Sequence, residues 1–214
     1  MAIRLNNNSI FIHIPKTGGQ WVAHVLRLMG LYSNKEKQSH LNVKKVKEYL
    51  KEDVRFFGFI RHPLEWFKSS WSQHRDDPGV RERNLTCISR GNLWTAEHSG
   101  RQFADFMQGD LNVALEKMID KYPGFISWLF NEYTEGLDYV GRFEYLRIDL
   151  EDILKNLGFK LTIKQIDIIE NEKPSNVHGA KHTEKFSQRL IDKLFETESC
   201  IEKYNYSYIP RGLV

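Results

Sequence analysis

The sequence predicts an α/β fold, a single P-loop-like domain with a central parallel sheet flanked by helices. Two apolar runs, at residues 10–14 and 54–60, have the composition of buried strands, and a helical pattern follows each of them. The chain has 214 residues, 41% of them hydrophobic, which is enough for one sizeable core. A strand, a helix and a second strand imply a right-handed parallel crossover, whose ligands bind beyond the carboxyl ends of the strands.

The composition favours a folded protein with small anionic ligands. A formal net charge of +3 is too weak to indicate a nucleic-acid-binding protein. Cys87 and Cys200 are the only cysteines, and they show neither metal-ligand spacing nor a disulfide framework. No signal pattern precedes the first expected strand, and no stretch approaches the length of a membrane span. We therefore expect a cytoplasmic protein without a membrane span.

The loop after the first expected strand suits an anion. Gly18 and Gly19 let the backbone approach a ligand without a Cβ in the way, and the first N–H groups of the next helix point the same way. Lys16 adds a mobile positive charge and Thr17 a hydroxyl donor. A Walker A loop has its lysine after the glycines, whereas Lys16 precedes them. The alternative is a strand-to-helix turn that needs glycine only for its conformation.

The elements around this loop follow from apolar spacing. A helix is expected over about 20–29, with one apolar face and Gly30 as its C-cap. Polar residues 33–42 are interpreted as a connection, and a short helix is expected from Val43 to Leu50.

The second expected strand, 54–60, leads into a helix that begins at Pro63 and runs to about His74, because proline suits the first helical position. Residues 75–100 are the least regular part of the chain and are interpreted as a substrate-side loop, with a solvated insertion as the alternative. The remaining expected elements are helices over about 102–121 and 124–132, a strand over 138–144, a helix capped by Asp149 that ends at Gly158, and a C-terminal helix over 183–205.

A second motif follows the second expected strand. In the run RHPLEWFKSSW, Arg61 ends the strand and Ser69 lies about two turns into the next helix. An arginine fork and a hydroxyl donor in this arrangement can converge on one anion. Together with IPKTGG after the first strand, this motif resembles the signatures of the PAPS-dependent sulfotransferase superfamily. The resemblance points in particular to the carbohydrate, heparan sulfate 2-O-sulfotransferase-like branch.

The resemblance implies PAPS (3′-phosphoadenosine 5′-phosphosulfate) as the donor and no metal. It implies that Arg61 and Ser69 hold the 3′-phosphate, and that Lys16 meets the charge on the leaving oxygen. The segment assigned to the 5′-phosphosulfate comprises Lys16, Thr17, Gly18, Gly19, Gln20 and Trp21.

The resemblance extends to later elements. Residues 140–144, VGRFE, resemble a late family strand, and residues 202–206 resemble the family's C-terminal ending. Three positions depart from the pattern: His62 stands where Asp is common, Trp66 where Arg is common, and Trp71 where Tyr is common. Large aromatic residues at such positions are more often core than sugar platforms.

A general base must accept the proton of the acceptor hydroxyl, and a group that titrates near neutrality is suited to this role. His40 occupies the place of the base histidine in the 2-O-sulfotransferase branch, and Glu36 is the alternative because other branches use a glutamate nearby. His13 and Glu65 are two further candidates, but His13 is better explained as a sheet residue and Glu65 as a structural one.

The sequence gives fewer indications of the residues that bind the acceptor substrate. Lys181, in the basic glycine-containing loop 177–182, is a candidate contact for the 3′-phosphate or the acceptor. The arginines of loop 75–100 favour an anionic acceptor, which the resemblance suggests is a small molecule or oligosaccharide. Two other functions stay open: a P-loop kinase or NTPase, and a non-catalytic relative that binds a glycan.

Overall fold

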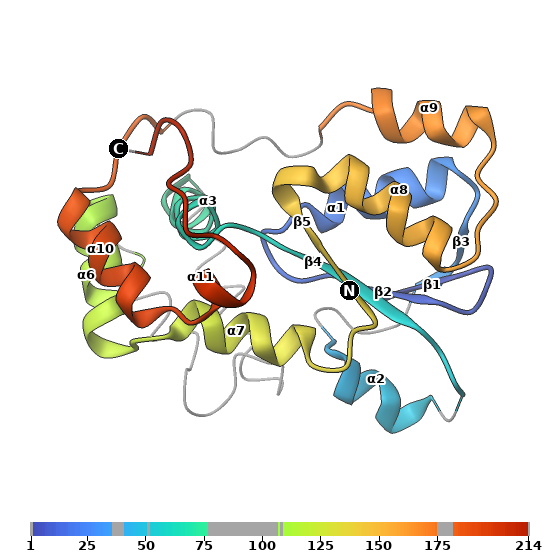
Figure 1. Ribbon diagram of the computed structural model, residues 1–214, viewed down its shortest axis with the longest axis horizontal. Coiled ribbons are helices and arrows are strands. Elements are labelled where there is room, and N and C mark those ends of the chain that lie inside the picture. The colour runs from blue at the N-terminus through green and yellow to red at the C-terminus, as the bar shows by residue number, and fades with distance from the viewer. Residues whose placement is uncertain are drawn as a thin grey trace. The chain divides into compact units, whose positions relative to one another are not determined.

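The computed structural model describes residues 2–35, 41–50, 52–76, 107, 109–174 and 182–213. They divide into two compact units (Figure 1). The first unit contains Met1–Arg61 and Asn131–Val177, and the second contains His62–Phe130 and His178–Val214.

The first unit is built on a five-stranded sheet in the order β3-β1-β2-β4-β5. Its strands are β1 (Ala2–Leu5), β2 (Ile10–Ile12), β3 (Tyr32–Lys35), β4 (Phe56–Ile60) and β5 (Tyr139–Arg142). β2, β4 and β5 run parallel, whereas β1 pairs antiparallel with both β2 and β3. The α/β class with parallel central strands is confirmed, and the sheet as a whole is mixed.

The sequence predicts neither β1 nor β3. The strand expected to come first is β2, and the segment 33–42 that was interpreted as a connection contains most of β3. β1 and β2 form a hairpin in which the Leu5 N–H donates to the Ser9 carbonyl over 2.8 Å and Asn8 adopts a φ of 67°. These strands are short and β3 is polar, as edge strands often are, so they carry little periodic apolar signal.

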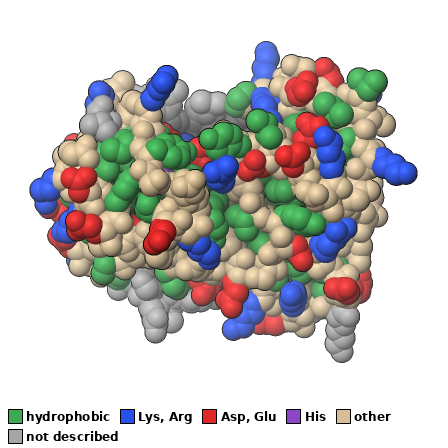
Figure 2. Space-filling model, viewed as in Figure 1, with side chains coloured by type: hydrophobic (Ala, Val, Ile, Leu, Met, Phe, Trp, Pro, Cys, Tyr) green, Lys and Arg blue, Asp and Glu red, His purple; other side chains and the backbone are tan. Residues whose placement is uncertain are grey.

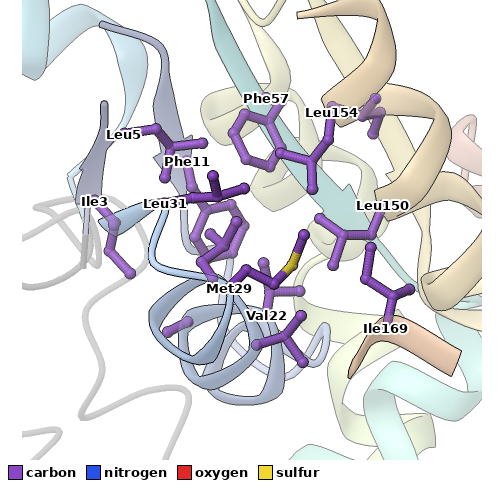
Figure 3. Packing of buried hydrophobic residues seen from close by; sticks show 14 of the residues in the cluster. Ile3, Leu5, Phe11, Val22, Met29, Leu31, Phe57, Leu150, Leu154 and Ile169 are labelled. Atoms are coloured by element: carbon purple, nitrogen blue, oxygen red, sulfur yellow. The ribbon is translucent and has the colours of Figure 1, made fainter. Parts of the chain in front are cut away.

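One face of this sheet packs against α1 (Gly19–Leu28), α8 (Leu146–Asn156) and α9 (Ile163–Asn171). Figure 3 shows side chains of these three helices gathered beside Phe11 of β2 and Phe57 of β4. On the other face, the Lys47 ammonium of α2 (Val43–Tyr49) lies 5.5 Å from the centre of the Phe56 ring. All five residues of β4 are buried, which explains why its sequence is an unbroken apolar run.

Two boundaries after β5 differ from the prediction. A short 3-10 helix, η1 (Phe143–Tyr145), replaces the expected end of the strand, and α8 begins at Leu146. Asp149 was wrongly predicted to cap α8: it lies within the helix, and its carboxylate accepts the Arg142 N–H over 2.7 Å. α9 was not predicted, although Thr162 and Gln165 form a capping box at its start.

The second unit consists mainly of helices. They are α3 (Pro63–Asp76), α6 (Leu111–Lys121), the part of α7 (Phe125–Thr134) that precedes Asn131, α10 (Gln188–Thr197) and α11 (Cys200–Lys203). α6 and α10 lie side by side (Figure 1), joined by an ion pair of Arg189 with Glu116 at 2.6 Å. The helix expected over 102–121 is described only from Leu111. Asp110 caps it, because the Asp110 carboxylate accepts the Asn112 N–H.

The prediction of a single C-terminal helix over 183–205 is wrong. α10 begins at Gln188 and ends at Thr197, and α11 follows as a separate helix. At the break, Glu198 has an extended backbone, with φ of −103° and ψ of 97°, and its buried carboxylate accepts the Ile126 and Ser127 N–H groups at the start of α7. Burial raises the pKa of this carboxyl. Among the described helices, none combines the length and the apolar character needed to cross a bilayer.

Candidate anion-binding site

The ends of three neighbouring parallel strands form the candidate site in the first unit. β2, β4 and β5 present their carboxyl ends at one edge of the sheet, where the chain continues as the 13–18 loop, as Arg61 and as η1. Arg61 Nη1 lies 3.5 Å from the Lys16 carbonyl oxygen, and the Arg61 guanidinium lies 4.2 Å from the centre of the Phe143 ring. The two predicted cations of the site are therefore brought together.

The backbone of the loop is wound tightly. Lys16 and Gly18 both have left-handed conformations, with φ of 66° and 78°. The buried Thr17 hydroxyl donates to the Ile14 carbonyl over 2.9 Å, so this donor serves the loop itself. α1 then starts at Gly19, and its N-cap residue, Gly18, has no side chain that could cap it. The first N–H groups of a helix have no acceptor within it, which makes this end suited to an anion.

Packing as well as ligand approach accounts for the two glycines. A Cβ at Gly18 would lie 2.9 Å from atoms of both the Phe143 and Leu146 side chains. A Cβ at Gly19 would lie 2.0 Å from Cδ2 of His13, so the imidazole occupies the place of any side chain there. A turn that needs glycine for its conformation therefore explains Gly18, which has a left-handed φ. Gly19 is explained differently, because any side chain there would collide with the His13 ring.

Lys16 differs from a solvent-exposed lysine in the pKa of its ammonium group. Burial, with the nearby positive charge of Arg61 as a second cause, lowers the pKa of its ammonium from 10.5 to about 8. A bound anion would stabilise the charged form and raise that pKa again. The site thus concentrates positive charge that a dianionic group would neutralise.

We expect Lys16 to make a contribution to the stability of the ligand-free protein that rises with pH between about 8 and 10.5. In this range the unfolded chain retains the Lys16 proton and the folded protein has released it, so this contribution to the free energy of unfolding increases with pH. The buried Cys200 and Tyr133 act in the opposite direction, because burial raises the pKa of each and they ionise first in the unfolded chain. Urea unfolding at pH 7, 8, 9 and 10 measures this. Lys16→Met should remove this contribution, so the wild type should gain stability relative to the variant as the pH rises, and equal pH slopes in the two proteins would show that the Lys16 pKa is not lowered.

The other residues of the predicted segment differ in exposure. Gln20 is exposed, whereas Trp21 is buried to 5% exposure. The Trp21 indole N–H donates to the Glu172 carbonyl over 3.4 Å, and the Arg147 guanidinium lies 5.0 Å from its ring centre. The Trp21 side chain is thus part of the core, so any nucleotide contact from this residue would come from its backbone.

The remaining predicted site residues lie elsewhere. Ser69 is a partly buried residue of α3, in the second unit, and its joint role with Arg61 stays a prediction. His40, Glu36 and Lys181 fall outside the described residues, as does the predicted substrate-side loop from residue 77 to residue 100.

The three residues that depart from the family pattern, one directly before α3 and two within it, are buried. Trp66 and Trp71 are fully buried, which confirms them as core. The buried His62 accepts the Leu64 N–H at Nδ1 over 3.2 Å, and its Nε2 lies 2.8 Å from the Tyr208 carbonyl, to which it donates. His62 therefore anchors the C-terminal segment to the start of α3.

Sequence reasoning missed Phe143 and Leu146 as parts of the site and gave His13 no contact with the loop. The VGRFE run carries a signal only through the family resemblance, and the sequence accounts for the glycine pair by ligand approach or by turn conformation, not by side-chain packing. The usable signal was the glycine pair itself, since adjacent glycines after a strand also indicate close side-chain packing.

Comparisons with known proteins give one match. A model of a family described as "Sulfotransferase family" matches residues 2–206, which cover most of both units. No curated protein and no solved structure matches the chain.

On the face seen in Figure 2, basic and acidic side chains are interspersed, consistent with the small net charge.

Proposed function

The chain belongs to the sulfotransferase family, and we propose that it transfers a sulfuryl group from PAPS to a hydroxyl group of a saccharide. The observation that carries the proposal is the pairing of Lys16 and Arg61 beside a left-handed glycine turn at the start of α1. We further propose one sulfotransferase domain over residues 1–214, since the family match runs through both units, and a carbohydrate branch related to the heparan sulfate 2-O-sulfotransferases.

The chemistry requires positioning and charge stabilisation. The acceptor oxygen forms a bond to sulfur while the bond from sulfur to the bridging oxygen breaks, leaving adenosine 3′,5′-bisphosphate. Lys16 would meet the negative charge that grows on that bridging oxygen, and the N–H groups at the start of α1 would face the sulfuryl oxygens. Arg61, with Ser69, is proposed for the 3′-phosphate because a guanidinium pairs with phosphate as a fork.

His40 is the proposed base, with Glu36 as the alternative. Replacing His40 with alanine should lower turnover about 100-fold while the affinity for adenosine 3′,5′-bisphosphate stays unchanged, because the base acts only on the acceptor proton. Steady-state kinetics and calorimetry measure the two quantities. His24→Ala is the matched control, since the His24 side chain is 42% exposed and its Nε2 lies 3.4 Å from a Glu172 carboxylate oxygen at the surface. Near-normal turnover in His40→Ala, with a large loss in Glu36→Gln, would assign the role to Glu36.

The donor is tested by thermal shift with PAPS, adenosine 3′,5′-bisphosphate and ATP, because a ligand that binds only the folded protein raises its melting temperature. We expect both 3′-phosphorylated nucleotides to raise it more than ATP does. A rise with ATP alone would favour a kinase or NTPase instead. Transfer of labelled sulfate from PAPS to oligosaccharides, anionic ones included, then separates an enzyme from a relative that only binds glycans.

A further inference from the structure

Phe143 joins two parts of the candidate site that are far apart in the sequence. It is the first residue of η1, directly after β5. Two atoms of its ring, Cδ2 and Cε2, lie 2.9 and 3.0 Å from the position that a Cβ would take at Gly18. The same ring lies 4.2 Å from the Arg61 guanidinium carbon. One aromatic side chain therefore supports both the left-handed turn of the loop and the arginine at the end of β4.

The contact with Arg61 matters because of the charge next to it. Arg61 is close enough to Lys16 to contribute to the lowered pKa of that lysine, so the two side chains repel each other before a ligand binds. An aromatic face attracts a guanidinium and offsets part of this repulsion. A guanidinium stacked on a ring keeps its N–H edges available to a phosphate.

We propose that Phe143 is a positioning residue that holds the Arg61 guanidinium ready for the 3′-phosphate of the nucleotide. The inference rests on the proposed function, which assigns that phosphate to Arg61. Phe143 makes no contact with the nucleotide in this role and acts through Arg61 and through the Gly18 turn.

The same helix offers a matched control. Tyr145, two residues along η1, is 44% exposed, and its ring lies 4.5 Å from the Arg142 guanidinium carbon. Tyr145→Leu removes a similar arginine–aromatic contact from the same 3-10 helix, but one that involves neither Arg61 nor the loop.

The experiment measures the affinities of adenosine 3′,5′-bisphosphate and adenosine 5′-phosphate by calorimetry. Phe143→Leu should weaken the bisphosphate about tenfold and the 5′-phosphate no more than about twofold, as expected for loss of a partly buried cation–π contact. Phe143→Tyr keeps the ring and should bind like the wild type, as should Tyr145→Leu. Circular dichroism and melting temperature establish folding, and Phe143→Met serves as a second ring-free variant if the leucine variant unfolds.

A double-mutant cycle separates positioning from general damage. In an Arg61→Ala background, Phe143→Leu should weaken the bisphosphate by less than about twofold further, because its effect passes through the arginine. Additive losses, or wild-type affinity in Phe143→Leu, would overturn the assignment of Phe143 and leave the proposed function standing. Absence of bisphosphate binding by the wild type would overturn both.

Discussion

Replacing Lys16 with methionine is expected to lower turnover about 1000-fold, as for the loss of a charged group that stabilises a leaving oxygen. Methionine keeps most of the apolar stem and removes the ammonium that lies beside Arg61 at the loop. The affinity for adenosine 3′,5′-bisphosphate should fall only about tenfold, because one charged contact is lost in the ground state. The larger effect on turnover follows because the charge on the bridging oxygen develops in the transition state. Sulfate transfer from labelled PAPS and calorimetry give the two values.

Lys44→Met is the control for this change, because Lys44 is an exposed lysine of α2. Its turnover should equal that of the wild type. If Lys16→Met lost affinity and turnover by the same factor, Lys16 would act in binding alone. If its turnover stayed within fivefold of the wild type, the role at the leaving oxygen would be wrong.

The parts of the fold that carry the site were predictable because they have strong local signals. β4 is an unbroken apolar run and α1 has one buried face, so both are recognisable without knowledge of their partners. β3 carries no such signal, since its pairing with β1 is a long-range contact of a short polar segment. For β1, a signal was present: residues 6–9, NNNS, separate two apolar runs as the turn of a hairpin does.

Within the candidate site as well, the residues with local sequence signals were predictable and those placed only by side-chain packing were not. Lys16 and Arg61 were predicted together because each follows a recognisable strand, and the parallel order of β2 and β4 brings the ends of these strands to one edge. Phe143 and His13 could not be placed against the glycines, because those contacts depend on side-chain directions and not on spacing. The Thr17 hydroxyl illustrates the same limit: its residue type suited a ligand, whereas its donor bond goes to Ile14.

Replacing Gly19 with alanine is expected to destabilise the protein by about 3 kcal/mol, at the upper end for overpacking a closed site. The new Cβ would lie 2.0 Å from Cδ2 of His13, and the His13 ring is itself stacked on Phe11, with ring centres 6.3 Å apart. The ring or the start of α1 must therefore move. Urea unfolding measures the loss, and affinity for adenosine 3′,5′-bisphosphate should fall with it, because the first turn of α1 is the part displaced.

The double variant Gly19→Ala with His13→Ala makes this explanation testable. Without the imidazole, alanine at the first position of α1 meets no such obstacle, and its higher helix propensity should make the Gly19→Ala change neutral or slightly stabilising. Gly30→Ala is the control: no described atom lies within 4 Å of its added Cβ, so the cost of about 1 kcal/mol comes from its φ of 69° and should not depend on His13. A Gly19→Ala cost that is equal with and without the imidazole would mean that the glycine is required by the backbone, and the contact with His13 would then not explain it.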